Sequence, residues 1–133
     1  MEIYKLVFSP IEVNTYIIVD ESGDCAIIDC GCYDDQESGR FATFIKDKNI
    51  NPVLLLNTHC HLDHIFGNRF ILERYGLRPF SNEFDEMNRK NAIQHAMLFG
   101  MTMENPPEPA GFITDNQVVT FGVTELVALL VPG

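Results

Sequence analysis

A short apolar run that leads directly into a histidine-rich segment constrains this chain more than any other feature. Residues 53–56 are all apolar, as is typical of a strand that is covered on both faces of its sheet. The segment that follows, residues 57–64, contains three of the four histidines of the chain. A buried strand that ends in such a segment predicts a sheet edge where several polar side chains converge.

The residues before this run predict strands and one helix. We expect strands over residues 2–8, 13–20 and 25–29, and a helix from a cap at Ser38 to about Asn49. Because strand–helix–strand connections are right-handed, the strands at 25–29 and 53–56 should lie parallel and close together in one sheet. Both strands then end at the same edge, which brings Asp29 to the histidine-rich segment.

The remaining residues continue the alternation of helices and strands. We expect helices over 66–75, ended by Gly76, and over 83–99, then a loop over 100–111 and final strands over 117–121 and 124–131. The chain has 133 residues and shows no repeat or linker, so we expect one domain over residues 1–133. This order of elements predicts the α/β class, which some schemes call α+β.

Charge and composition exclude several functions. Nine lysines and arginines against nineteen aspartates and glutamates give a formal net charge of −10. This charge repels phosphate backbones and anionic membrane surfaces, so we expect neither a nucleic-acid nor a membrane partner. Neither the first residues nor the longest apolar run, residues 126–131, has the apolar core of a signal peptide or a membrane span. We therefore expect a cytoplasmic protein whose four cysteines are reduced.

The histidine-rich segment has the composition of a metal site. In an extended chain, His59 and His61 project to one side and Cys60 to the other, into packing. If a helix then begins, Asp63 and His64 can face a second point nearby, and two metal ions about 3.5–4 Å apart are a standard device for hydrolysis. The alternative is that these are polar loop residues, with Asp63 as the cap of the helix. A cap needs one such residue, not four.

Several motifs resemble one family. The pattern HxHxDH stands at residues 59–64, and the segments 13–16, 27–31 and 56–58 also match. With these motifs the chain resembles the metallo-β-lactamase superfamily of hydrolases, and within it the glyoxalase II-like branch. The resemblance implies the first half of an αββα sandwich, a mixed sheet with helices on its outer face.

The resemblance also implies a role for each site residue. His59 and His61 would bind a first metal ion, and Asp63 and His64 a second. Asp63 would also hold and orient the attacking water, which makes it the catalytic residue. Asp29 would orient the histidine-rich loop through hydrogen bonds, although an ordinary turn residue at the end of a strand is the alternative.

The implied activity is metal-dependent hydrolysis of a small-molecule thioester, ester or lactone by a metal-bound hydroxide. The cofactor would be zinc, with two ions in the complete site and iron or manganese as alternatives. Family members take further ligands from a Pro-Gly-His segment and from residues beyond it, whereas this sequence ends at Pro132-Gly133. We therefore expect the chain to be the N-terminal half of a longer domain, truncated at its C-terminus.

Three alternatives stay open at this point. The chain could be a catalytically incompetent half-domain that forms homo-oligomers, since half a sandwich exposes one face of its sheet. Redox chemistry at an iron site would use the same ligands. His95, expected on a helix, could replace the missing third ligand of one metal ion or be a structural histidine.

Overall fold

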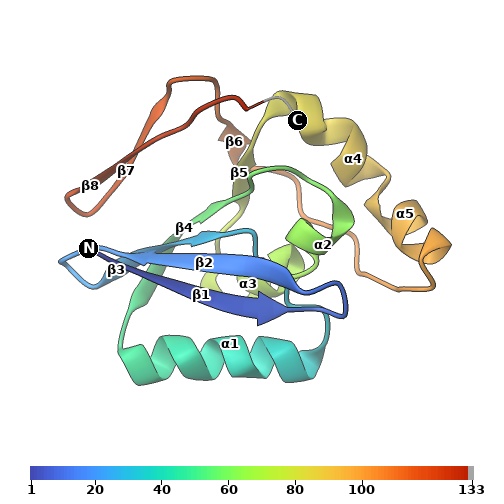
Figure 1. Cartoon of the computed structure of the whole chain (residues 1–133), viewed down its shortest axis with the longest axis horizontal. Helices are drawn as coiled ribbons and strands as arrows, with labels where there is room; N and C mark the ends of the chain where they lie inside the picture. The colour runs from blue at the N-terminus through green and yellow to red at the C-terminus, as the bar shows by residue number, and fades with distance from the viewer. Residues whose placement is uncertain (132–133) are drawn as a thin grey trace.

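A six-stranded mixed sheet organises residues 1–131, the part of the chain that the computed structural model describes (Figure 1). Its strands lie in sequence order and are β1 (Glu2–Phe8), β2 (Val13–Val19), β3 (Asp24–Ile28), β4 (Asn51–Leu56), β5 (Pro79–Ser81) and β6 (Gly111–Phe112). The pairs from β1 to β3 are antiparallel and those from β3 to β6 are parallel. The strands β7 (Val118–Phe121) and β8 (Thr124–Val127) form a separate antiparallel hairpin. The structure is thus of the mixed α/β class that the sequence predicts.

The helices connect the parallel strands. They are α1 (Asp35–Lys48), α2 (Leu62–Ile65), α3 (Asn68–Tyr75), a 3-10 turn η1 (Glu83–Asp85), α4 (Glu86–Lys90) and α5 (Ala92–Leu98). Within residues 1–131, no helix has the length and apolar character needed to cross a membrane.

The predicted parallel pairing of β3 and β4 is confirmed. Ile28 lies opposite Leu56 in the ladder, so both strands end at the same level of the sheet. The backbone N–H of Asp29 donates a hydrogen bond to the carbonyl of Leu56 over 3.0 Å. As a result, the first residue after β3 and the first residue after β4 lie side by side at the carboxyl edge of the sheet, where α/β folds place their ligands.

The two faces of the sheet are covered by different elements. Ile17 and Ile27 point to the face on which α1 packs, and they are fully buried with Phe41 of that helix. Their neighbour Ile18 points to the opposite face, because successive side chains of a strand alternate. There it packs against Phe121 of the hairpin. The β7–β8 hairpin therefore covers the sheet on the side away from α1 (Figure 1).

Some predicted boundaries are wrong. Helix α1 begins one turn before Ser38, because the carboxylate of Asp34 caps it by accepting a hydrogen bond from the Glu37 N–H over 2.9 Å. The single helix expected over residues 83–99 is divided into η1, α4 and α5, with Asn91 in a non-helical conformation between the last two. The last strand ends at Val127 instead of Val131. The short strand β5 was not expected, because its three residues have no alternating pattern and are ordered by pairing with β4 and β6.

A buried carboxylate attaches the hairpin to the sheet. Asp20, which directly follows β2 and is 3% exposed, accepts hydrogen bonds from the Ser22 N–H at 2.9 Å, the Val123 N–H at 3.1 Å and the Thr124 hydroxyl. A Cβ atom at Gly122 would lie 2.1 Å from the Asp20 carboxylate, and Gly122 has a φ of +57°, so the turn requires glycine. The hydrogen bonds from Thr124 and Ser22 hold the pKa of Asp20 well below its usual value.

We predict that Asp20→Asn loosens the hairpin and removes an acid-sensitive step. Because the folded-state pKa is lowered, the carboxylate stabilises the fold above the unfolded pKa of about 4, and this contribution is lost as the pH falls toward the folded pKa. NMR shifts of the β7–β8 amides should therefore move at acidic pH in the unchanged chain and should no longer show this step in Asp20→Asn. Asp24→Asn is the control, because the Asp24 side chain accepts a hydrogen bond from Asn51 and not from the hairpin within the described residues. Identical acid titrations in Asp20→Asn and the unchanged chain would contradict the prediction.

Candidate metal centre

The histidine-rich loop folds tightly between β4 and α3. Cys60 is buried against Ile65 and Ala92, which fixes the middle of the loop. The rings of His59 and His61 meet on the other side, with their centroids 4.6 Å apart. Helix α2 then begins with His61 in the cap position, and the His61 side chain makes no capping hydrogen bond. The helix-cap alternative is therefore wrong, because Asp63 lies inside the first turn and is not the cap.

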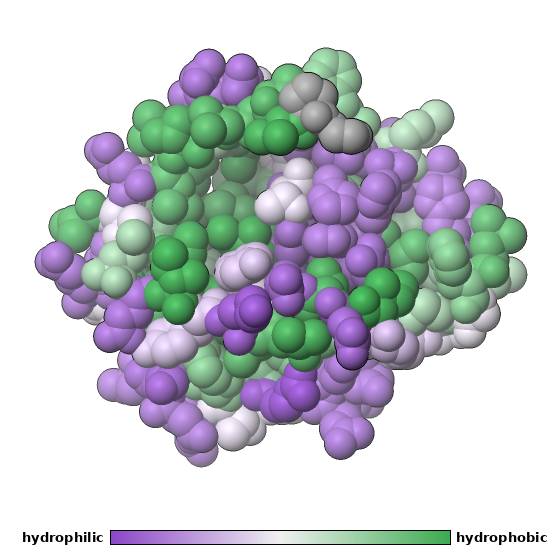
Figure 2. All heavy atoms as spheres, viewed as in Figure 1, coloured by the Kyte–Doolittle hydropathy of each residue, from purple (hydrophilic) through white to green (hydrophobic). Residues whose placement is uncertain are grey.

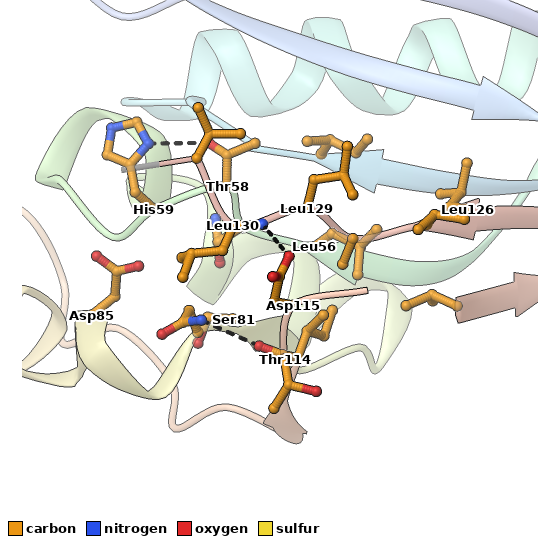
Figure 3. Close-up of a pocket in the computed structure, with 18 of the residues that line it drawn as sticks. Leu56, Thr58, His59, Ser81, Asp85, Thr114, Asp115, Leu126, Leu129 and Leu130 are labelled. Atoms are coloured by element: carbon orange, nitrogen blue, oxygen red, sulfur yellow. Dashed lines mark hydrogen bonds between the residues drawn. The ribbon is translucent and has the colours of Figure 1, made fainter. Parts of the chain in front are cut away.

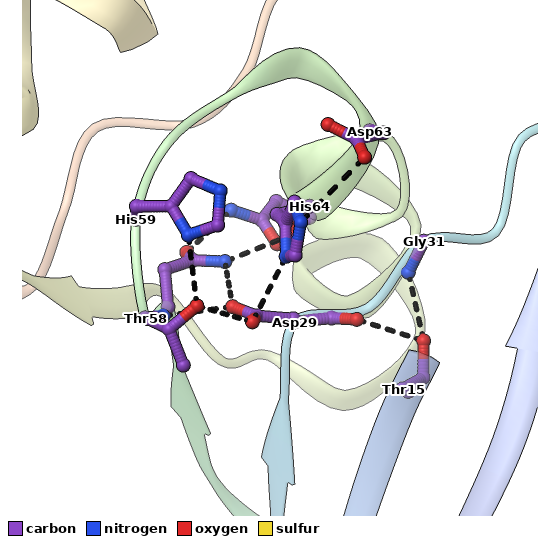
Figure 4. A network of polar contacts seen from close by, with 9 residues as sticks. Thr15, Asp29, Gly31, Thr58, His59, Asp63 and His64 are labelled. Carbon is purple, nitrogen blue, oxygen red and sulfur yellow. Dashed lines mark hydrogen bonds and ion pairs between the residues drawn. The ribbon is translucent and has the colours of Figure 1, made fainter. Parts of the chain in front are cut away.

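The candidate ligands lie close together, and Figure 4 shows three of them, His59, Asp63 and His64. The ring of His64 lies 4.0 Å from that of His59, measured between centroids. Its Nε2 atom is 3.5 Å from a carboxylate oxygen of Asp63. The tight turn into α2 thus places His64 and Asp63 beside the pair formed by His59 and His61, at the carboxyl edge of the sheet.

The Asp29 carboxylate lies beneath these ligands. One oxygen, Oδ1, accepts hydrogen bonds from the Thr58 N–H at 2.8 Å and from the Asn57 side-chain amide at 3.4 Å. The other, Oδ2, accepts from the Thr58 hydroxyl at 2.5 Å and from Nδ1 of His64 at 3.0 Å. Asp29 is 4% exposed and has a φ of +57°, a left-handed conformation that turns its side chain under the loop. The turn after β3 thereby holds the loop after β4.

These contacts fix the proton positions on two histidines. Since Asp29 only accepts, His64 in its neutral form must carry its proton on Nδ1, which leaves the Nε2 lone pair free. The Thr58 hydroxyl gives its single proton to Asp29, so at its 3.0 Å contact with Nδ1 of His59 it must accept. His59 is then also protonated on Nδ1. One carboxylate thus leaves Nε2 of both rings available for a metal ion.

The same contacts separate the pKa values of the two histidines. Burial lowers the pKa of His64, but the hydrogen bond and charge of Asp29 outweigh it, so the net shift is upward. Burial also lowers the pKa of His59, and the neighbouring His64 and His61 lower it further. His64 therefore takes up a proton before His59 as the pH falls.

The donor set fits a transition-metal ion in its chemistry. Imidazole nitrogens and a carboxylate suit zinc, iron and manganese. Within residues 1–131, however, no group of three or more His, Cys, Asp or Glu side chains is placed to hold one ion. The site instead offers pairs of donors, whereas a zinc ion normally takes at least three protein ligands. Pro132 and Gly133, at which the sequence led us to expect the next ligand segment, lie outside the described residues.

A groove of about 830 Å³ extends from the histidines between the sheet and the hairpin (Figure 3). Its polar end includes Thr58, His59 and Asp85. One wall is apolar and comes from the strands and the residues after β8; it includes Ile18, Ile28, Leu56, Val119, Leu126 and Leu129. Polar side chains, among them Ser81, Thr114 and Asp115, also line the groove. Figure 2 shows apolar residues gathered around this hollow. A ligand that reaches His59 therefore meets an apolar surface next to it.

The sequence did not single out every residue of the polar network. The side chains of Asn57, Thr58 and Asn68 bind Asp29 directly or through one another. Asn57 and Thr58 belong to the segment 56–58 that matches the family motifs, but the sequence assigned no role to either side chain. Asn68 has no such signal, because only the tertiary fold brings it to the network.

Comparisons with known proteins agree on one family. A model of the metallo-beta-lactamase superfamily matches residues 9–133. A protein described as a probable metallo-hydrolase, YqgX of Bacillus subtilis (strain 168), is 27% identical over 134 residues, which cover 97% of this chain and 59% of that protein. A hydroxyacylglutathione hydrolase of Buchnera aphidicola subsp. Baizongia pistaciae (strain Bp) is 40% identical over 73 residues, which cover 53% of this chain and 27% of that protein.

Solved structures share the fold. The crystal structure of BLEG-1 B3 metallo-beta-lactamase has a TM-score of 0.81 at 19% identity, over 95% of this chain and 59% of that one. The structure of TTHA1623 in a di-iron-bound form has a TM-score of 0.76 at 22% identity, over 86% of this chain and 55% of that one. In each of these four comparisons, the chain spans less than two thirds of the other protein.

We predict that Asp29→Asn lowers the pKa of His64. The substitution removes the negative charge and the acceptor that together raise this pKa, while burial continues to lower it. An NMR titration of the histidine rings measures the change. Asp35→Asn removes an equal charge in the first turn of α1, which is not among the charges that raise the pKa of His64, and should leave that pKa unchanged. An unaltered His64 titration in Asp29→Asn would show that the carboxylate does not control this ring.

Proposed function

The chain belongs to the metallo-beta-lactamase superfamily, and we propose that it carries metal ligands of a glyoxalase II-like hydrolase that acts on a small-molecule thioester, ester or lactone. One observation supports this most strongly. His59 and His64 both have Nε2 free, and the Asp63 carboxylate lies 3.5 Å from one of these atoms. Such an arrangement at the carboxyl edge of a sheet suits the binding of metal ions.

In this proposal, the four side chains have separate tasks. His59 and His61 hold one metal ion, and His64 and Asp63 hold the other. Bound metal ions would polarise the substrate carbonyl and lower the pKa of water, which is the chemistry that hydrolysis requires. Asp63 also orients the attacking water through its carboxylate, and Asp29 keeps His64 in the correct tautomer. We propose zinc as the metal, with iron or manganese as alternatives for the same donors.

The groove suggests how a substrate is bound. Its polar end lies at His59 and His61, and its apolar walls extend away from them. An acyl group could lie along Leu56 and Ile28 with its carbonyl at the histidines. The hydroxyacylglutathione hydrolases among the relatives favour a thioester over the other two classes. A cytoplasmic location stays a prediction of the sequence.

We further propose that these residues form the N-terminal half of the functional domain. Each metal ion has two donors here, and the missing ligands would come from another segment of the longer protein. The incomplete donor groups of residues 1–131 and the partial coverage of the relatives support this view. On its own, the chain should bind metal weakly and hydrolyse little, because solvent ligands are not held in place before the metal ion binds.

The alternative of a self-associating half-domain is favoured by the apolar groove. Leu129, Leu130 and Val131 are all more than half exposed at its edge. A second copy could cover this surface, although the net charge of −10 opposes association. We predict dimers or larger oligomers in light scattering, more of them at high salt, where the repulsion is screened. A monodisperse monomer at high concentration in high salt would rule this alternative out.

We predict that Co²⁺, as a spectroscopic probe for zinc, binds the chain through the histidine-rich loop. His59→Ala and His64→Ala should each weaken binding about tenfold or more, since each removes one of only two donors to its ion. His95→Ala is the matched control, because His95 lies on α5 outside the loop. The measurement is a titration followed by the cobalt absorption bands. An equal effect of His95→Ala and His64→Ala would contradict the proposal.

A Co²⁺ titration also tests the proposal that this chain is the N-terminal half of a longer domain. A longer chain that includes a Pro-Gly-His segment and the following half should bind Co²⁺ more tightly and hydrolyse a thioester faster than the 133-residue chain. Equal binding and equal turnover would show that the four ligands already form a complete site.

A further inference from the structure

Two buried asparagines, Asn57 and Asn68, lie behind the Asp29 carboxylate, and the proposed hydrolysis assigns no role to either. The side-chain amide of Asn68 donates to Oδ1 of Asn57 over 2.9 Å. The amide of Asn57 in turn donates to Oδ1 of Asp29 at 3.4 Å and to the His64 carbonyl at 3.1 Å. We propose that Asn57 and Asn68 are positioning residues, which form a relay that holds Asp29 in the orientation that keeps Nε2 of His64 free. The importance of that orientation for metal binding rests on the proposed function.

The direction of the relay follows from the acceptors at its end. A carboxylate and a backbone carbonyl can only accept, so the Asn57 side chain must turn its NH₂ group toward Asp29 and His64. Its oxygen then points the opposite way and requires a donor. The NH₂ group of Asn68 is that donor. Each amide therefore has one allowed orientation: Asp29 and the His64 carbonyl set that of Asn57, and Asn68 supplies the donor that this orientation requires.

The backbone fixes both ends of the relay relative to each other. The Gly67 N–H donates to the carbonyl of Cys30 over 2.9 Å, next to Asp29. A Cβ atom at Gly67 would lie 2.5 Å from the Cys30 sulfur, so α3 can approach this turn only through a glycine. Asn68, the first residue of α3, is thereby held at a set distance from Asp29. The hydrogen bonds of Asn68 and Asn57 connect the start of α3 to Asp29 across this distance.

Packing alone does not explain an amide at position 68. Asn68 is 2% exposed, and its Oδ1 atom has no hydrogen-bond partner within residues 1–131. A buried acceptor without a partner costs stability, and an apolar side chain of similar size would not carry that cost. What the asparagine provides is its donor to Asn57. Asn68 therefore contributes to the polar network around Asp29 more than to the packing of the core.

Loss of the relay should change the tautomer of the His64 ring more than it changes the stability of the fold. Without the Asn68 donor, Oδ1 of Asn57 becomes a buried acceptor without a partner, and its side chain is no longer held against Asp29 from behind. Asp29 then keeps its Thr58 donors but loses the support of Asn57 on Oδ1, so its carboxylate shifts relative to the His64 ring. His64 would lose the acceptor that fixes its proton on Nδ1, and its ring would become a mixture of tautomers.

The test is Asn68→Leu, which keeps the branched shape of the side chain and removes the donor. In the metal-free chain, the ring ¹⁵N shifts of neutral His64 should change from the Nδ1-protonated pattern to an average of both tautomers. The melting temperature should stay close to that of the unchanged chain, because one unpaired buried acceptor replaces another. Co²⁺ affinity should fall about tenfold. Asn57→Leu should have the same effect on the tautomer, and the double variant should add little to either single change.

The control is Ile71→Val on the same helix. Ile71 is fully buried in α3 and belongs to the apolar core, so this change should lower the melting temperature and leave the His64 tautomer unchanged. Asn68→Ser, whose hydroxyl is too short to reach Asn57, should repeat the tautomer change if Asn68→Leu fails to fold. An intact Nδ1-protonated pattern in Asn68→Leu or Asn68→Ser, or an equal change in Ile71→Val, would overturn the relay. Failure of the unchanged chain to bind Co²⁺ would instead overturn the proposed function, since the NMR result needs no metal.

Discussion

The Asp29 carboxylate is the interaction on which the site depends. It ends β3, and its four hydrogen bonds reach Thr58 twice, Asn57 and His64. The burial of Cys60 holds the backbone of the loop after β4, and the Asp29 hydrogen bonds fix the orientation of the rings on it. Because a carboxylate only accepts, it sets the proton positions of its partners as well as their places. One side chain therefore converts a run of histidines into an arrangement with free nitrogen atoms on one side.

The sheet makes this interaction possible. Asp29 can reach the loop because β3 and β4 are parallel neighbours whose last residues, Ile28 and Leu56, are opposite each other. Ile27 lies opposite Leu55 in the same ladder, and both are fully buried in the core that α1 covers, which anchors the two strands to each other. The geometry of the candidate metal centre is thus an outcome of core packing one layer away.

Local sequence signals predicted the end of a helix correctly where a single residue stops it. Asn49 and Gly76 end their helices in left-handed conformations, as expected of stop residues. They predicted wrongly where two residues compete to cap one helix, or where a strand depends on partner strands that are distant in the sequence. Asp34 caps α1 in place of Ser38, because its carboxylate is the one that meets the free N–H groups. Strand β5 forms only because β4 and β6 supply its hydrogen-bond partners.

The sequence by itself determined the parallel β3–β4 unit and the set of side chains at its edge, because apolar periodicity and residue spacing are local properties. From spacing alone, His59 and His61 were expected on one side with Cys60 packed away from them; the two rings lie 4.6 Å apart, and Cys60 is buried in an apolar cluster. Only the tertiary structure decided how those side chains are oriented and protonated. That information depends on Asn68 and Asp29, which are far apart in sequence and meet through the close approach of Gly67 to Cys30. Hydrogen-bond direction is a property of the assembled network, and no single segment of the chain contains it.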